Sequence, residues 1–235
     1  MKIHRTFIGL CLVALLSACG GGGGGGGGSA APSGPVTSTL SFPLQSAYNT
    51  LIAGGVTKTA TITGTCSGTA TFTTTAATGG ATFEGTTGRL SAVATQTTNV
   101  TNCTPPSSTR TLTEYYDTNY APLGFNISGG IYGVFLTPPL FPISVTVGNT
   151  GFLGTENLYT DSTHSVPVGT QDLSYVIEAD TASTAIVDLI LRSFDNSHAL
   201  TATQHSRYRI ALTGPLIYVS FDAVLNGSIT HLTYQ

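Results

Sequence analysis

Hydrophobic and polar residues alternate with a period of two along most of the chain after residue 55, as is typical of β-strands. In residues 56–73, every second position from Thr57 to Thr73 is Thr or Ser, and mostly apolar residues lie between them. This pattern places the hydroxyl groups on one face of a strand. Because these 18 residues exceed the usual strand length of about 3–10 residues, we expect a turn between Gly64 and Gly68.

Only residues 42–55 have helical periodicity. Their apolar stripe has the spacing i, i+3, i+4, i+7, i+8, and it consists of Leu44, Ala47, Tyr48, Leu51 and Ile52. Pro43 suits the first turn, and Gly54 and Gly55 suit the end of a helix.

Short apolar runs predict further strands, and the turn residues between them predict short connections. The predicted strands are residues 81–84, 90–102, 109–116, 131–136, 143–147, 173–179, 184–194, 200–212, 216–225 and 228–234. Residues 116–130 are predicted as irregular chain and residues 148–169 as a surface connection. Asn226-Gly227 is a hairpin signal, and its register places Asp222 opposite His231 and Phe221 opposite Leu232.

These elements predict a mainly β fold, an antiparallel sandwich or barrel-like meander with one short N-terminal helix. It extends over residues 36–235, either as one unit or as a Thr-rich half, 36–125, and a meander, 126–235.

Residues 1–18 have the features of a signal peptide, a basic start with Lys2 and Arg5 followed by a short apolar run. The sequence Leu16-Ser17-Ala18-Cys19 resembles the lipobox of bacterial lipoprotein precursors. The resemblance implies cleavage before Cys19, acylation of Cys19 and anchoring of the protein to a membrane.

Nine glycines, residues 20–28, follow Cys19, and residues 19–35 are predicted to form a tether. Such tails are similar to those of Gram-negative envelope lipoproteins. Gly20 directly after the cysteine resembles the pattern for sorting to the outer membrane, so this resemblance implies an envelope location, on either the periplasmic or the outer face.

The composition narrows the function classes. The chain has 235 residues, 41 of them Thr, and a formal charge of −3, which becomes −5 once Lys2 and Arg5 are removed. Such a chain has no basic field for nucleic acid. Cys66 and Cys103 are left as a pair in an oxidising compartment and predict a disulfide, with a metal site or redox thiol as the alternative.

No motif indicates catalysis or a cofactor. Asp222 and His231 form an apparent dyad, and a catalytic serine would have to lie against His231, but Ser220, on the same face, is two positions away. A cross-strand polar pair explains Asp222 and His231 equally well. The pairs Asp161–His164 and Asp195–His198 fall in predicted turns, where Asp is common, and no third metal ligand is near. We therefore expect no catalytic constellation, metal or cofactor.

Two features suggest binding. The segment 114–120 combines carboxylates with tyrosines that could stack on a sugar, and its candidate residues are Glu114, Tyr115, Tyr116, Asp117 and Tyr120. Strand alternation would, however, direct Glu114 and Tyr116 to one face and Tyr115 to the other. The threonine ladder resembles the ice-binding faces of antifreeze proteins, which need several ladders in register, whereas the sequence reveals one.

Three functional hypotheses follow. The first is a non-catalytic envelope protein with a structural or recognition role, facing another envelope protein or a glycan. The second is a carbohydrate-binding or glycan-acting surface domain at residues 114–120. The third is a carrier of a small apolar ligand, which requires an apolar cavity within the meander.

Overall fold

The computed structural model describes residues 35–225 and 228–235, which form one helix and thirteen strands. The helix is α1 (Leu44–Gly54). The strands are β1 (Val56–Gly64), β2 (Gly68–Thr74), β3 (Thr78–Phe83), β4 (Thr86–Val100), β5 (Ser107–Tyr116), β6 (Pro122–Ile127), β7 (Tyr132–Phe135), β8 (Thr150–Tyr159), β9 (Pro167–Ala179), β10 (Ala185–Phe194), β11 (Leu200–Ile210), β12 (Ile217–Leu225) and β13 (Ser228–Tyr234).

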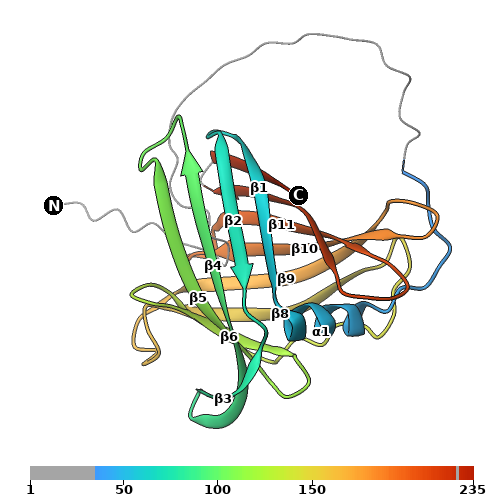
Figure 1. Ribbon diagram of the computed structural model, residues 1–235. Helices are drawn as coiled ribbons and strands as arrows, with labels where there is room; N and C mark the ends of the chain where they lie inside the picture. The colour runs from blue at the N-terminus through green and yellow to red at the C-terminus, as the bar shows by residue number, and fades with distance from the viewer. Residues whose placement is uncertain (1–34, 226–227) are drawn as a thin grey trace.

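Twelve of these strands form a closed antiparallel barrel (Figure 1). Each strand pairs with the next one along the chain, except that β2 does not pair with β3, and β1 pairs with β13. The ring closes where β2 pairs with β4, so that β3 is left outside it and pairs with β4 alone. The predicted mainly β, barrel-like fold with one short N-terminal helix is therefore confirmed.

Helix α1 closes one end of the barrel. Pro43 precedes it and Gly55 ends it with a φ of 65°, as the sequence predicts. Its apolar stripe packs on inward-facing side chains of β9, β10 and β11. The cluster includes Leu44, Ala47 and Leu51 of the helix and Tyr175, Ile177, Val187 and Tyr208 of the strands. Burial of this stripe, rather than helix propensity, stabilises so short a helix.

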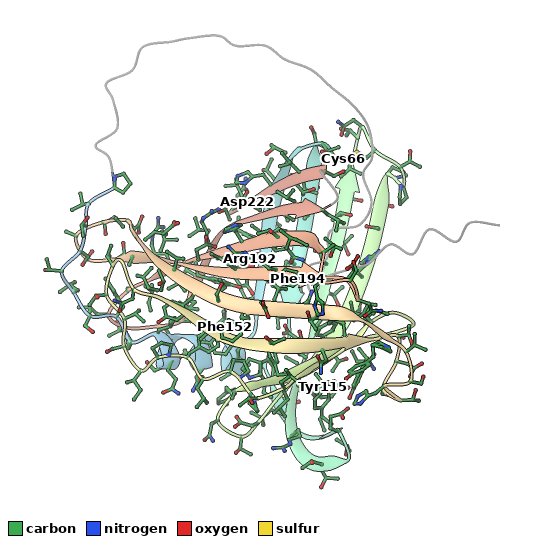
Figure 2. All side chains as sticks on the ribbon, turned by 180° about the vertical axis from the view of Figure 1, so that it is seen from behind. Cys66, Tyr115, Phe152, Arg192, Phe194 and Asp222 are labelled. Carbon is green, nitrogen blue, oxygen red and sulfur yellow. A yellow bond between two sulfur atoms is a disulfide. The ribbon has the colours of Figure 1, made fainter. Side chains whose placement is uncertain are left out.

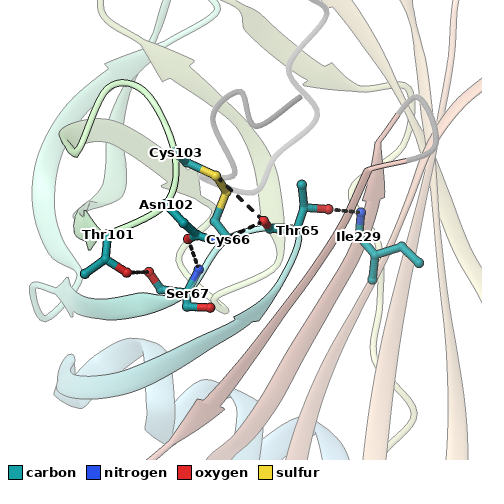
Figure 3. The surroundings of a disulfide bond; sticks show 7 residues. All are labelled: Thr65, Cys66, Ser67, Thr101, Asn102, Cys103 and Ile229. Carbon is teal, nitrogen blue, oxygen red and sulfur yellow. Dashed lines mark hydrogen bonds between the residues drawn. A yellow bond between two sulfur atoms is a disulfide. The ribbon is translucent and has the colours of Figure 1, made fainter. Parts of the chain in front are cut away.

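A disulfide fastens the opposite end (Figure 3). Cys66, in the predicted turn between β1 and β2, is bonded to Cys103 in the loop after β4, with a Cα–Cα distance of 5.9 Å. Asn102 Oδ1 accepts a hydrogen bond of 2.7 Å from the backbone N–H of Ser67. The predicted disulfide is thus confirmed, and it links the two strands that close the ring.

Three local predictions were wrong. Strand β6 lies within residues 116–130 and β8 within residues 148–169, both predicted to be irregular. Residues 143–147 form no named strand, and Val145 makes only an isolated bridge to Phe42. Both missed strands contain turn-forming residues, and pairing on both sides overrides this local preference.

The register of the last hairpin agrees with the sequence. Asp222 pairs with His231 and Phe221 with Leu232. The predicted turn residues, Asn226 and Gly227, lie outside the described residues, as do residues 1–34 with the predicted signal peptide, Cys19 and most of the predicted tether.

Candidate functional site in the barrel interior

A cavity of about 200 Å³ lies inside the barrel beneath α1. Because side chains alternate along each strand, every second residue of the ring points inward. Toward the disulfide end these residues fill the interior as two compact apolar clusters, and the cavity is left between those clusters and the helix. Its wall is mainly apolar and aromatic, and includes Tyr48, Leu51, Phe72, Leu112, Phe135 and Tyr218.

Two glutamates also line this cavity, Glu114 from β5 and Glu156 from β8. Glu156 is fully buried, and neither of its carboxyl oxygens has a hydrogen-bond partner. Glu114 Oε2 accepts a hydrogen bond of 2.8 Å from the hydroxyl of Tyr116.

Burial raises the pKa of both glutamates. For Glu156 desolvation is the larger cause, and the nearby carboxyl of Glu114 adds to it. For Glu114 desolvation raises the pKa, and the hydrogen bond from Tyr116 offsets this in part. The wall of the cavity therefore favours the neutral acids unless a positive charge comes close.

None of the residues that line the cavity is Lys, Arg or His. Arg110 is on the same strand and face as Glu114, four residues away, which is roughly 13 Å along a strand. Its position in the register is opposite Gln96. The lining thus has acidic groups without a basic one.

The five predicted binding residues do not form one site in the structure. Glu114 and Tyr116 share the inward face of β5. Tyr115, on the other face, stacks on Phe83 of β3 with ring centroids 4.5 Å apart and also borders the cavity (Figure 2). Asp117 Oδ1 accepts hydrogen bonds from two backbone N–H groups of its own turn. Tyr120 packs on the small cluster around Tyr116. The alternation inferred from the sequence agrees with this arrangement.

The predicted pair of Asp222 and His231 belongs to a charged cluster on the outer face of β10–β13. His231 Nδ1 and an Arg207 nitrogen bind opposite oxygens of Asp222. Burial opposes ionisation of Asp222, but the hydrogen bonds from His231 and Arg207 outweigh it, so that its pKa is lowered. Asp188 accepts a hydrogen bond of 2.7 Å from His205 in the same cluster.

The other ring nitrogen of His231 lies 3.1 Å from the hydroxyl of Thr233. This chain of Thr233, His231 and Asp222 has the order of a nucleophile, a base and a carboxylate. Catalysis would also need donors for an oxyanion, but Thr233 and His231 lie within ladders to β1 and β12, which use the backbone N–H groups. The geometry fits a cross-strand polar network.

The remaining Asp–His pairs are parts of turns. Asp161 Oδ1 accepts from Thr163 N at 2.8 Å, and Asp195 Oδ1 accepts from Ser197 N at 2.8 Å. Within the described part of the chain, no three His, Cys, Asp or Glu side chains converge as metal ligands.

The threonine face is wider than the sequence indicates. Outward-facing residues of β1, β2, β4 and β5 lie in register across the sheet. Two rows consist of threonines alone, Thr57–Thr73–Thr95–Thr111 and Thr59–Thr71–Thr97–Thr109. Hydroxyl pairs within these rows lie 3.0–3.3 Å apart, which fixes their side chains.

Comparisons with known proteins identify no relative of this chain. No family model matches the chain, and searches of curated proteins and of solved structures find no match. Among the described residues, α1 is too short to cross a membrane as a helix.

Proposed function

We propose that this protein is a lipid-anchored envelope protein whose barrel binds a small, mainly apolar molecule in its interior, without catalysing a reaction. The observation that carries the proposal is the apolar cavity beneath α1 and the unpartnered carboxyl group of Glu156 in its wall. Burying a polar group without a hydrogen bond costs free energy, about 1–3 kcal/mol, which a bound ligand would recover.

The size of the cavity limits the ligand. Pockets for drug-sized molecules have about 300–1,000 Å³, and this cavity has about 200 Å³. It therefore suits a compact molecule, and the aromatic side chains around it supply flat apolar surfaces for packing.

Neighbouring residues of β4 provide a matched test. Ala94 points into the cavity, whereas Val93 points outward and is 39% exposed. We expect Ala94→Leu to abolish the thermal stabilisation that small apolar compounds give to the purified barrel, and Val93→Leu to leave it unchanged. Circular dichroism checks that both variants fold. Equal stabilisation of both variants would contradict binding in the interior.

The anchor is tested separately. The lipobox resemblance supports acylation at Cys19, and mass spectrometry of membrane-extracted protein is expected to find a chain that begins at acylated Cys19. Cys19→Ala should move the protein from the membrane to the soluble fraction. An unmodified chain that begins elsewhere would refute the anchor.

A second candidate function rests on the threonine face. Ice binding needs several hydroxyl ladders in register, and two rows of four threonines lie side by side on β1, β2, β4 and β5. A thermal-hysteresis assay tests it: the activity should be present, be lost in Thr97→Lys at the centre of the face, and persist in Thr203→Lys on β11. Absence of hysteresis in the unmodified domain removes this candidate.

A further inference from the structure

We propose that the interior cavity takes a small apolar amine, bound as its ammonium ion with Glu156 as counter-ion and Glu114 beside it. This inference rests on the proposed ligand-binding function and names the chemical class of the ligand. Four observations on the described residues support it: the unused acceptors of Glu156, the donors already engaged around it, the absence of basic side chains in the cavity wall, and the aromatic rings there.

Glu156 belongs to the wall of the cavity. It pairs with Phe135 of β7 and with Gln171 of β9, and all three lie on the inner side of the barrel. Its side chain is fully buried and both oxygens are without partners. A carboxylate can accept about four hydrogen bonds, so a ligand with several N–H donors fits this acceptor.

Two neighbouring donors make hydrogen bonds to other groups. Gln171 Nε2 donates to Ser193 Oγ at 2.9 Å, and the hydroxyl of Tyr116 donates to Glu114 at 2.8 Å. A ligand with N–H groups can therefore supply the hydrogen bonds that Glu156 lacks in this structure.

The charges of the wall select a cation. Two carboxyl groups line the cavity, and no Lys, Arg or His does. A ligand carboxylate would have to be buried beside them without a counter-ion, which is strongly unfavourable in a medium of low dielectric constant. An ammonium ion instead stabilises the ionised form of Glu156, because an opposite charge at close range favours it.

Aromatic rings supply the second part of the recognition. Tyr48 stacks on Phe141 with ring centroids 4.1 Å apart, and Phe72 packs on Tyr218 at 5.3 Å. All four side chains line the cavity. The faces of such rings attract cations, and their surfaces pack on an apolar body.

The proton balance gives a distinctive signature. Burial raises the pKa of Glu156, which favours a protonated carboxyl group before the ligand binds. When an ammonium ion binds, that proton leaves for the solvent and the ammonium–carboxylate pair remains. Affinity should therefore rise with pH for as long as the free amine stays protonated.

The test compares three compounds of one chain length, hexylammonium, hexanol and hexanoate, by calorimetry on the intact barrel. We expect hexylammonium to bind at least about tenfold more tightly than the other two, and more tightly at pH 8 than at pH 6. Glu156→Gln should abolish both the preference and the pH dependence while hexanol still binds. Glu178→Gln, on the outer face and 43% exposed, should change neither.

The outcomes separate this inference from the proposed function. If hexanol or hexanoate binds as tightly as hexylammonium, the amine inference is overturned and ligand binding stands. If none of the three compounds binds the unmodified barrel, both are overturned. The comparison of compounds on the unmodified protein decides the question even if Glu156→Gln does not fold, and Glu114→Gln then serves as the second variant, with a weaker loss of preference expected.

Discussion

Gly133 of β7 leaves the space that the carboxyl group of Glu156 on β8 occupies, because a Cβ atom at Gly133 would stand 2.6 Å from Glu156 Oε1. The same atom would also collide with the ring of Phe125. The buried carboxyl and the glycine on the neighbouring strand therefore depend on each other.

Gly133→Ala is expected to lower the free energy of unfolding by about 1–3 kcal/mol, because the added methyl group overpacks the interior. Chemical denaturation measures the loss. Gly54→Ala is the matched control, since nothing lies within 4 Å of its Cβ position in α1, and it should be neutral or stabilising by up to about 1 kcal/mol. Equal effects of the two substitutions would contradict the close packing of Gly133.

Stability should fall as the pH rises above the ordinary range of a glutamate. Burial raises the pKa of Glu156 and Glu114 above the ordinary 4.5. A carboxyl group with a raised pKa stabilises the fold fully below its unfolded-state pKa, and this contribution is lost as the pH rises through the folded-state pKa.

Glu156→Gln stays neutral, so the decline of stability with pH should become shallower in this variant. Urea unfolding at pH 5, 7 and 9 measures the difference. Glu178→Gln, on the outer face, should retain the decline of the unmodified protein. Parallel curves for the unmodified protein and Glu156→Gln would show that Glu156 has no such role.

Removing the disulfide should destabilise the barrel. The bond between Cys66 and Cys103 joins residues 37 positions apart, and closing such a loop is worth about 3–4 kcal/mol in the chain-entropy model. The double variant Cys66→Ser, Cys103→Ser should lose about this much in a denaturant titration. A reducing agent should weaken the unmodified protein to the same extent and leave the double variant unchanged.

Disrupting the charged cluster on the outer face should lower the free energy of unfolding at neutral pH but not in acid. The pKa of Asp222 is lowered, so its contribution is present above the unfolded-state pKa and is lost as the pH falls through the folded-state pKa. Asp222→Asn should cost about 1–2 kcal/mol at pH 7, because its side chain is 31% exposed and solvent weakens the ion pairs.

At pH 3 the same substitution should have little effect. Thr233→Val removes only the exposed contact to His231 and should change stability by less than about 0.5 kcal/mol at either pH. An equal loss at pH 3 and pH 7 for Asp222→Asn would contradict the electrostatic explanation.

Alternation along the chain was enough to predict part of the fold. The hydroxyl ladder from Thr57 to Thr73 specifies two strands and the side that faces water, because one face of each strand is buried. The same rule placed Glu114 and Tyr116 on one face of β5 and Tyr115, which stacks on Phe83, on the other. The stripe of α1 was equally clear from its spacing.

Strands β6 and β8 were missed because they contain residues that weaken strands. Pro122 and Gly124 lie in β6, and Gly151 and Gly154 lie in β8. Two of these glycines admit a neighbouring ring: Phe83 approaches Gly124 and Tyr175 approaches Gly151. Such packing is tertiary information that the local sequence does not contain.

One of the three hypotheses required a cavity within residues 126–235, whereas the cavity found is lined by residues from both halves of the chain, and its most telling residue was not identified. Glu156 lies between Thr155 and Asn157, in a segment that is polar enough to be taken for a loop. The available signal was its distance of two residues from Leu158, which is buried in the interior. That signal has meaning only after the segment is recognised as a strand.

The position of β3 also bears on how the molecules behave toward one another in solution. In the described part of the chain, every strand of the ring has a partner on both sides, so the backbone of the barrel offers no template for another chain. The exception is β3, which pairs on one side only, is six residues long and has two register shifts between Thr78 and Thr82. Such an edge is too short and too irregular to recruit a further strand, which protects the protein against edge-to-edge aggregation at high local concentration.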